Sequence, residues 1–175
     1  LLERLRSGDI ALERELGLKV TIHDNCLSKL QDGRLQEVNR EIVERTGCSI
    51  VEMEHHGERS MCCGFGAAAS HFRVMDIMSS GYRRLKEIEA TGADAAVIYC
   101  PACLFILSVI KEMANCTIPF YHPVELVEMA PGTRPFRSPV GLVFGLEARN
   151  ADDEKYDPPL LAAFGMTEFA TLKVD

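Results

Sequence analysis

The sequence predicts an α/β fold, with a small parallel sheet of four strands in the order 2-1-3-4 and helices on both faces. Short runs rich in β-branched residues alternate with longer segments whose apolar residues recur at helical spacing. Residues 95–99 are apolar throughout, as expected for a strand covered on both faces. A cysteine or histidine follows each predicted strand. Because ligands gather at the carboxyl ends of parallel strands, the site is expected there.

The first half of the chain contains two predicted strands. Residues 1–16 predict one or two helices before Gly17, with Asp9 as an N-cap if there are two. The β-rich run at 18–22 is the first strand. A helix with apolar positions between 30 and 43 follows, and residues 49–53 form the second strand.

The second half repeats this alternation. A long helix is predicted over 67–90, with its apolar residues on one face. The strand at 95–99 leads into a helix over 102–114, which is apolar nearly all round and should be buried. Residues 117–121 form the fourth strand, and a short helix passes through 124–127.

We expect one cysteine-rich domain over residues 1–130, including the N-terminal helices at 1–17. From residue 131 onward the periodicity fades, and proline-rich and acidic pieces predict a loop-rich C-terminal extension over 131–175. The chain starts with a charged, helical segment rather than a signal peptide. It has no initial Met, which indicates a fragment or a lost beginning.

Composition narrows the class of protein. With 175 residues, 47% of them hydrophobic, the chain can bury a core. No apolar run approaches the roughly 18 residues of a membrane span, so no transmembrane segment is expected. The formal net charge is −7 and no basic stripe is present, which argues against nucleic acid as a partner. Seven cysteines outside a short secretory framework favour a reducing compartment, the cytoplasm.

Five cysteines stand at three places: Cys26, then Cys62 and Cys63 after 35 residues, then Cys100 and Cys103 after a further 36. Cys26 and Cys100 come at the ends of predicted strands, and Cys62 and Cys63 lie in the irregular polar stretch that follows the strand at 49–53. Side chains of adjacent residues in a strand point to opposite faces, so two neighbouring cysteines share one centre only from an irregular loop. Gly64 and Gly66 permit such a loop. We therefore expect the five thiols to converge at one edge of the sheet.

The spacing leaves three chemistries open. A C-x2-C motif serves zinc sites, dithiol redox pairs and iron–sulfur clusters alike. Zinc is satisfied by four ligands, whereas a polynuclear iron–sulfur cluster can use more thiolates. The number of cysteines, five, therefore favours an iron–sulfur cluster over a zinc ion. A zinc-binding structural or docking module and a cluster-free dithiol redox protein remain the alternatives.

The other cysteines and two adjacent histidines have plainer interpretations. Cys48 and Cys116 each lie beside a predicted strand and are expected to be small buried core residues. His55 and His56 are expected to be solvated loop residues rather than ligands.

Three polar residues are expected near the strand ends. His23 and Asp24 should shape the turn after the first strand and hydrogen-bond near the site, with direct ligation or proton transfer as the alternative. His122 should close the fourth strand, with an orienting contact near the site as the alternative.

Three motifs together resemble a known family. They are His-Asp-Asn-Cys at 23–26, Cys-Cys-Gly-Phe-Gly-Ala at 62–67 and Cys-Pro-Ala-Cys at 100–103. In order and spacing they resemble the cysteine-rich CCG domain in the B-type subunit of heterodisulfide reductase. That domain also occurs in iron–sulfur subunits of glycolate oxidase and anaerobic glycerol-3-phosphate dehydrogenase, and in lactate-utilisation proteins. The resemblance covers roughly 18–130; Asn25 and Ala67 replace the family's proline and last glycine.

The resemblance implies that Cys26, Cys62, Cys63, Cys100 and Cys103 hold an iron–sulfur cluster. In the best-understood relatives this is a 4Fe–4S cluster of unusual noncubane form that works on disulfides; other relatives relay electrons, and some copies hold zinc. The implied function is an iron–sulfur subunit or domain of an oxidoreductase, carrying electrons to or from a thiol/disulfide or a partner redox protein. The implied partners are iron–sulfur or flavin subunits, because the chain has no dinucleotide fingerprint of its own.

Overall fold

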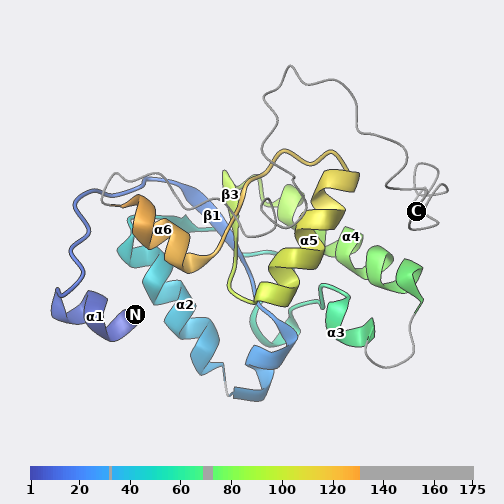
Figure 1. The fold of residues 1–175 in the computed structure, drawn as a ribbon, viewed down its shortest axis with the longest axis horizontal. Helices are drawn as coiled ribbons and strands as arrows, with labels where there is room; N and C mark the ends of the chain where they lie inside the picture. Colours follow the sequence, from blue (N-terminus) through green and yellow to red (C-terminus); the bar gives the residue numbers. More distant parts are fainter. Residues whose placement is uncertain (32, 69–72, 131–175) are drawn as a thin grey trace.

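The computed structural model describes residues 1–31, 33–68 and 73–130 (Figure 1). Its strands are β1 (Lys19–His23), β2 (Ser49–Ile50), β3 (Ala95–Ile98) and β4 (Phe120–Tyr121). Its helices are α1 (Leu2–Ser7), α2 (Arg34–Arg45), α3 (Phe65–Ala68), α4 (Val74–Ala90), α5 (Pro101–Met113) and α6 (Pro123–Met129), with 3-10 turns η1 (Cys26–Gln31) and η2 (Gly57–Arg59). The predicted extension over 131–175 lies outside the described residues.

The four strands form one all-parallel sheet in the order β2-β1-β3-β4, which confirms the predicted topology. In the pairing of the two central strands, Val20 lies opposite Ala95 and His23 lies opposite Ile98. The carboxyl ends of β1 and β3 are therefore level. The segments that follow them, which begin at Cys26 and Cys100, leave the sheet at the same edge.

Helices cover both faces, and alternate residues of each strand face opposite layers. Val20, Ile22 and Val97 form one core with Val43 of α2 and Leu126 of α6. On the other face the sheet packs against α4 and α5, which also lie against each other. Figure 1 shows α2 and α6 grouped on one side of the sheet, with α4 and α5 on the other.

Cys48 and Cys116 are confirmed as core residues, with 6% and 8% of their surfaces exposed. Cys48 belongs to the core under α2 and α6, whereas Cys116 packs in the layer of α4 and α5. No helix in the described ranges is both long and apolar enough to cross a membrane.

The predicted helix over residues 9–16 is wrong. Helix α1 ends at Ser7 because Gly8 adopts a left-handed conformation with φ of 80°. The chain after it has no regular helix, so Asp9 caps none. Instead the backbone N–H of Leu16 donates to the carbonyl of Thr46 at 2.9 Å, and this segment runs along the turn that ends α2.

The single helix predicted over 67–90 is also wrong, because a new helix starts at Val74. Arg73 is extended, with ψ of 156°, and its backbone N–H donates to the Asp76 carboxylate at 3.0 Å. This hydrogen bond caps the first turn of α4, so the helix begins at Val74. Residues 69–72 lie outside the described part of the chain. The edge strands β2 and β4 are shorter than predicted, at two residues each.

Candidate metal centre

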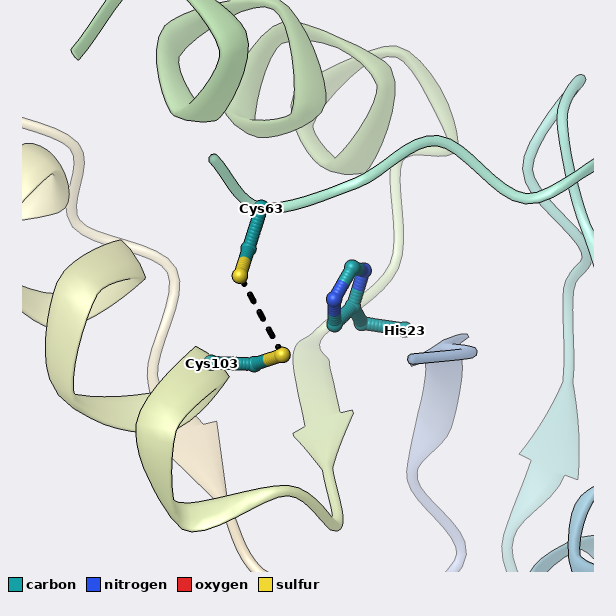
Figure 2. A group of neighbouring side chains, drawn as sticks. All are labelled: His23, Cys63 and Cys103. Atoms are coloured by element: carbon teal, nitrogen blue, oxygen red, sulfur yellow. Dashed lines mark hydrogen bonds between the residues drawn. The ribbon is translucent and has the colours of Figure 1, made fainter. Parts of the chain in front are cut away.

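The five predicted cysteines come together beyond the carboxyl ends of the strands. Cys26 opens η1 directly after β1, Cys62 and Cys63 lie in the loop before α3, and Cys100 and Cys103 lie at the start of α5. The sulfurs of Cys63 and Cys103 are 3.2 Å apart (Figure 2). Besides burial, the nearby Cys62 and Cys63 raise the pKa of the Cys26 thiol, and Cys100 adds to the effect of Cys63 and burial in raising the pKa of Cys103. The five thiols are therefore electrostatic neighbours, and Cys63 and Cys103 also form a compact group with His23.

Burial within this cluster is graded. Only 2% of Cys63 and 3% of Cys103 is exposed, whereas Cys62 and Cys100 are half-buried and Cys26 is exposed. The centre thus has a closed inner side under α4 and α5 and an open side at Cys26. A bound group would be shielded from water on one side and accessible on the other.

Gly64 brings the double-cysteine loop against α4. Its φ is +96°, and a Cβ on this residue would collide with the carbonyl oxygen of Ile77. Gly81 has the complementary role on α4, since a Cβ there would collide with Ile110 and crowd the carbonyl of Cys63. The two glycines let the loop and the helix touch through their backbones, which places Cys63 deep beside Cys103.

Replacing Gly64 by alanine should therefore displace the loop. Alanine would add backbone strain of about 1–2 kcal/mol at positive φ and also a collision with the Ile77 carbonyl. We expect a lower urea midpoint and reduced metal binding per chain. Gly92→Ala is the matched control: its φ is +60°, with nothing within 4 Å of the new Cβ. Equal losses in both variants would show that the contact with α4 is unimportant.

A buried cation lies behind the cysteines. Arg84 of α4 is fully buried; its Nε donates to Nδ1 of His23 at 2.8 Å, and its Nη1 donates to the carbonyl of His55 and to Glu87. Burial lowers the pKa of Arg84, whereas Glu87 and the nearby Cys103 oppose that shift. Because thiolates placed together repel one another, this positive charge stabilises them.

The pKa values of the two innermost thiols are shifted in opposite directions. The hydrogen bond with Cys103 lowers the pKa of Cys63 to about 4; burial opposes this shift, and the side chain of His23 adds to it. The same hydrogen bond, together with burial, raises the pKa of Cys103. The pair therefore loses its first proton readily, and metal binding would have to displace the second.

His23 is completely buried and faces this thiol pair. Burial lowers the pKa of its imidazole, an effect that Cys63 opposes and the charge of Arg84 strengthens. A ring nitrogen of His23 and the sulfurs of Cys63 and Cys103 lie within 4.8 Å of one another (Figure 2). The expected place of His23 near the site is thus confirmed.

Asp24 belongs to a hydrogen-bond network that includes none of the five thiols. Its carboxylate accepts hydrogen bonds from both terminal nitrogens of Arg40 at 3.0 and 2.8 Å, from the backbone N–H of Gly57 at 2.7 Å and from the Tyr99 hydroxyl at 3.2 Å. Burial alone would raise its pKa, but these donors and the charge of Arg40 lower it. Asp24 therefore ties the ends of β1 and β3 to the loop after β2, as a structural carboxylate.

Asn25, which stands where the family motif has proline, closes the next turn. Its Oδ1 accepts from the backbone N–H of Ser28 at 2.7 Å, and its carbonyl accepts from the Ser28 hydroxyl at 2.7 Å. Hydrogen bonds thus order the turn that carries Cys26, where proline would do so by fixing its backbone angle.

The remaining histidines have structural contacts. His55 and His56 are partly exposed loop residues, as expected, and each also has a partner in the protein. His55 pairs with Glu87, and Nδ1 of His56 bonds to the carbonyl of Met53 at 2.7 Å. His122 caps α6 by accepting from Val124 at 3.3 Å and closes β4 as predicted.

Sequence reasoning missed Arg84. The signal was its position on α4, three residues after Gly81 and four before Ile88, both of which are buried. That spacing places Arg84 on the buried face of the helix. A buried arginine at this position requires partners, which His23 and Glu87 supply.

Comparison with known proteins yields one family and several relatives. The model of the CCG family, described as a cysteine-rich domain, matches residues 20–108. A probable membrane-anchored ferredoxin of Chromohalobacter salexigens is 29% identical over 77% of this chain and 20% of its own length. One subunit of the dihydromethanophenazine:CoB–CoM heterodisulfide reductase of Methanosarcina barkeri is 26% identical over 75% of this chain and 32% of its own. The probable iron–sulfur-binding oxidoreductase FadF of Bacillus subtilis is 30% identical over 73% of this chain and 18% of its own length. The chain thus spans about a third or less of each relative.

Proposed function

Because this chain belongs to the CCG family of cysteine-rich domains, we propose that it is the iron–sulfur-binding part of an oxidoreductase and passes electrons between partner redox groups. The observation that carries the proposal is the convergence of five thiols from three strand ends, with the sulfurs of Cys63 and Cys103 3.2 Å apart. The names of the relatives, which include a ferredoxin, a heterodisulfide reductase and an iron–sulfur-binding oxidoreductase, support the same class.

The residues present fit such a cluster. The thiolates of Cys26, Cys62, Cys63, Cys100 and Cys103 would hold it, and their number suits a polynuclear centre better than a single zinc ion. Arg84 supplies a buried positive charge beside this sulfur-rich site. When bound, a 4Fe–4S cluster would supply electron transfer at a potential set by its sulfur contacts and exposure.

The chain's own residues would decide which side of the centre meets a partner. Cys63 and Cys103 close the inner side, so electrons would enter or leave on the side of Cys26. Leu27 and Phe65, with 62% and 44% of their surfaces exposed, are the neighbours of Cys26 and Gly64 in the chain and offer apolar contact there. We propose that its partners are iron–sulfur or flavin subunits. If the protein acts as heterodisulfide reductase does, its substrate is a small thiol or disulfide. We propose the cytoplasm as its location.

Anaerobic reconstitution tests this function. We expect about four iron and four acid-labile sulfide per chain, with a paramagnetic signal in one redox state of the cluster. The leading alternative is a zinc ion, which four of the five thiolates could hold. One zinc per chain without sulfide would establish a structural zinc module instead. Absence of metal combined with reversible oxidation of two thiols would establish a dithiol protein.

A further inference from the structure

The side chain of Arg84 is held in one orientation by three acceptors. Its Nε donates to Nδ1 of His23 at 2.8 Å, and its Nη1 donates to the His55 carbonyl at 2.7 Å and to a carboxylate oxygen of Glu87. Arg84 and His23 are both completely buried. Nη2 is buried without a partner among the described residues, and turning the guanidinium away from the imidazole would leave further buried groups unpaired.

This contact determines which ring nitrogen of His23 carries the proton. A guanidinium remains protonated in proteins and offers only donors, so Nδ1 must be the acceptor. A neutral imidazole has one donor and one acceptor nitrogen, and the proton of His23 is therefore on Nε2. A doubly protonated ring would instead set Nδ1–H against the N–H of Arg84.

Nε2 of His23 faces the thiols. It is buried and has no hydrogen-bond partner among the residues that the structure describes. Figure 2 shows a ring nitrogen turned to the gap between Cys63 and Cys103. Histidines that bind a metal usually donate their other ring N–H to a carbonyl or carboxylate. Here the other nitrogen accepts from a cation, which is the opposite arrangement and argues against His23 as a ligand.

We propose that Arg84 holds His23 in the Nε2–H tautomer, and that His23 donates a hydrogen bond to the thiolates of Cys63 and Cys103 and thereby raises the reduction potential of the cluster. This role rests on the proposed iron–sulfur function. Hydrogen bonds to the ligating sulfurs stabilise the more negative, reduced state. His23 is a tuning residue outside the ligand set, and Arg84 is a positioning residue that acts through it.

The tautomer can be tested without any metal. In reduced, metal-free protein labelled with nitrogen-15, two-bond proton–nitrogen correlations distinguish the two imidazole tautomers of His23. We expect Nε2–H in the wild type and a mixture of tautomers in Arg84→Met. A wild-type ring protonated at Nδ1 would overturn the proposal. Because this measurement needs no cluster, it stands even if reconstitution shows that the proposed function is wrong.

The effect on the cluster requires a matched pair of variants. In His23→Gln the side-chain amide can donate from nearly the same place as Nε2, whereas His23→Leu has no donor. We expect the midpoint potential of reconstituted protein to stay close to wild type in the glutamine variant and to become more negative in the leucine variant. Both should bind as much iron as the wild type. Equal potentials in all three proteins, or loss of iron in both variants, would overturn the tuning role.

Discussion

Cys63→Ser is expected to bind only a small fraction of the wild-type iron and sulfide after anaerobic reconstitution, while its far-ultraviolet circular dichroism stays unchanged. Cys63 is the innermost thiol, 3.2 Å from Cys103, and a serine oxygen is a much poorer ligand for iron than a thiolate. Cys63 itself packs in a small core cluster with Ile98 and Leu107. The fold should persist because the other core clusters, between the sheet and the helices, do not include the motif loop. Iron and sulfide per chain are the measured quantities.

Cys116→Ala is the matched control for this experiment. Cys116 is also a buried cysteine, 8% exposed, but it packs with Met78 and Leu85 in the layer of α4 and α5. We expect full iron content and a loss of about 1–2 kcal/mol in unfolding free energy. The wild type and Cys116→Ala must be kept reduced, because the short distance between Cys63 and Cys103 would favour a disulfide. Normal iron content in Cys63→Ser, or loss of iron in Cys116→Ala, would show that the ligand set is wrong.

Asp24→Ala is expected to lower the unfolding free energy of the metal-free protein by about 1–3 kcal/mol, the usual cost of leaving a buried hydrogen-bond donor without its acceptor. The carboxylate is completely buried, and its removal would leave the N–H of Gly57 without an acceptor. Arg40 and Tyr99 would each lose one acceptor and keep another, Glu52 and Ser28 respectively. These groups join the ends of two central strands to the loop before the double cysteine. Urea unfolding followed by circular dichroism measures the loss.

Glu41→Ala provides the comparison, since it removes another carboxylate with arginine partners. Glu41 pairs with Arg6 and Arg45 at the surface, where water and salt screen the interaction. Its loss should hardly change the urea midpoint. If Asp24→Ala were as mild as Glu41→Ala, the network at the end of β1 would not stabilise the fold, and its role would need another explanation.

The topology and the gathering of the cysteines could be predicted from local patterns. Alternating strand and helix patterns, with an apolar strand at 95–99, indicate a covered parallel sheet. A parallel sheet places all its strand ends at one edge, so cysteines in the segments that follow its strands are expected to come together. The sequence alone therefore determined the sheet order and the cysteine cluster, and its motifs indicated the family.

Other features depend on contacts between distant segments. Helical spacing shows that Arg84 lies on the buried face of α4, but not that it meets His23, 61 residues earlier. Periodicity also does not reveal that the polar run at Arg73 starts a new helix. Only the tertiary structure places His55 against Glu87, and Asp24 in a network apart from the thiols. The physical reason is that a buried polar side chain takes whichever partner the packed core brings within hydrogen-bonding distance, and distance along the chain does not specify that partner.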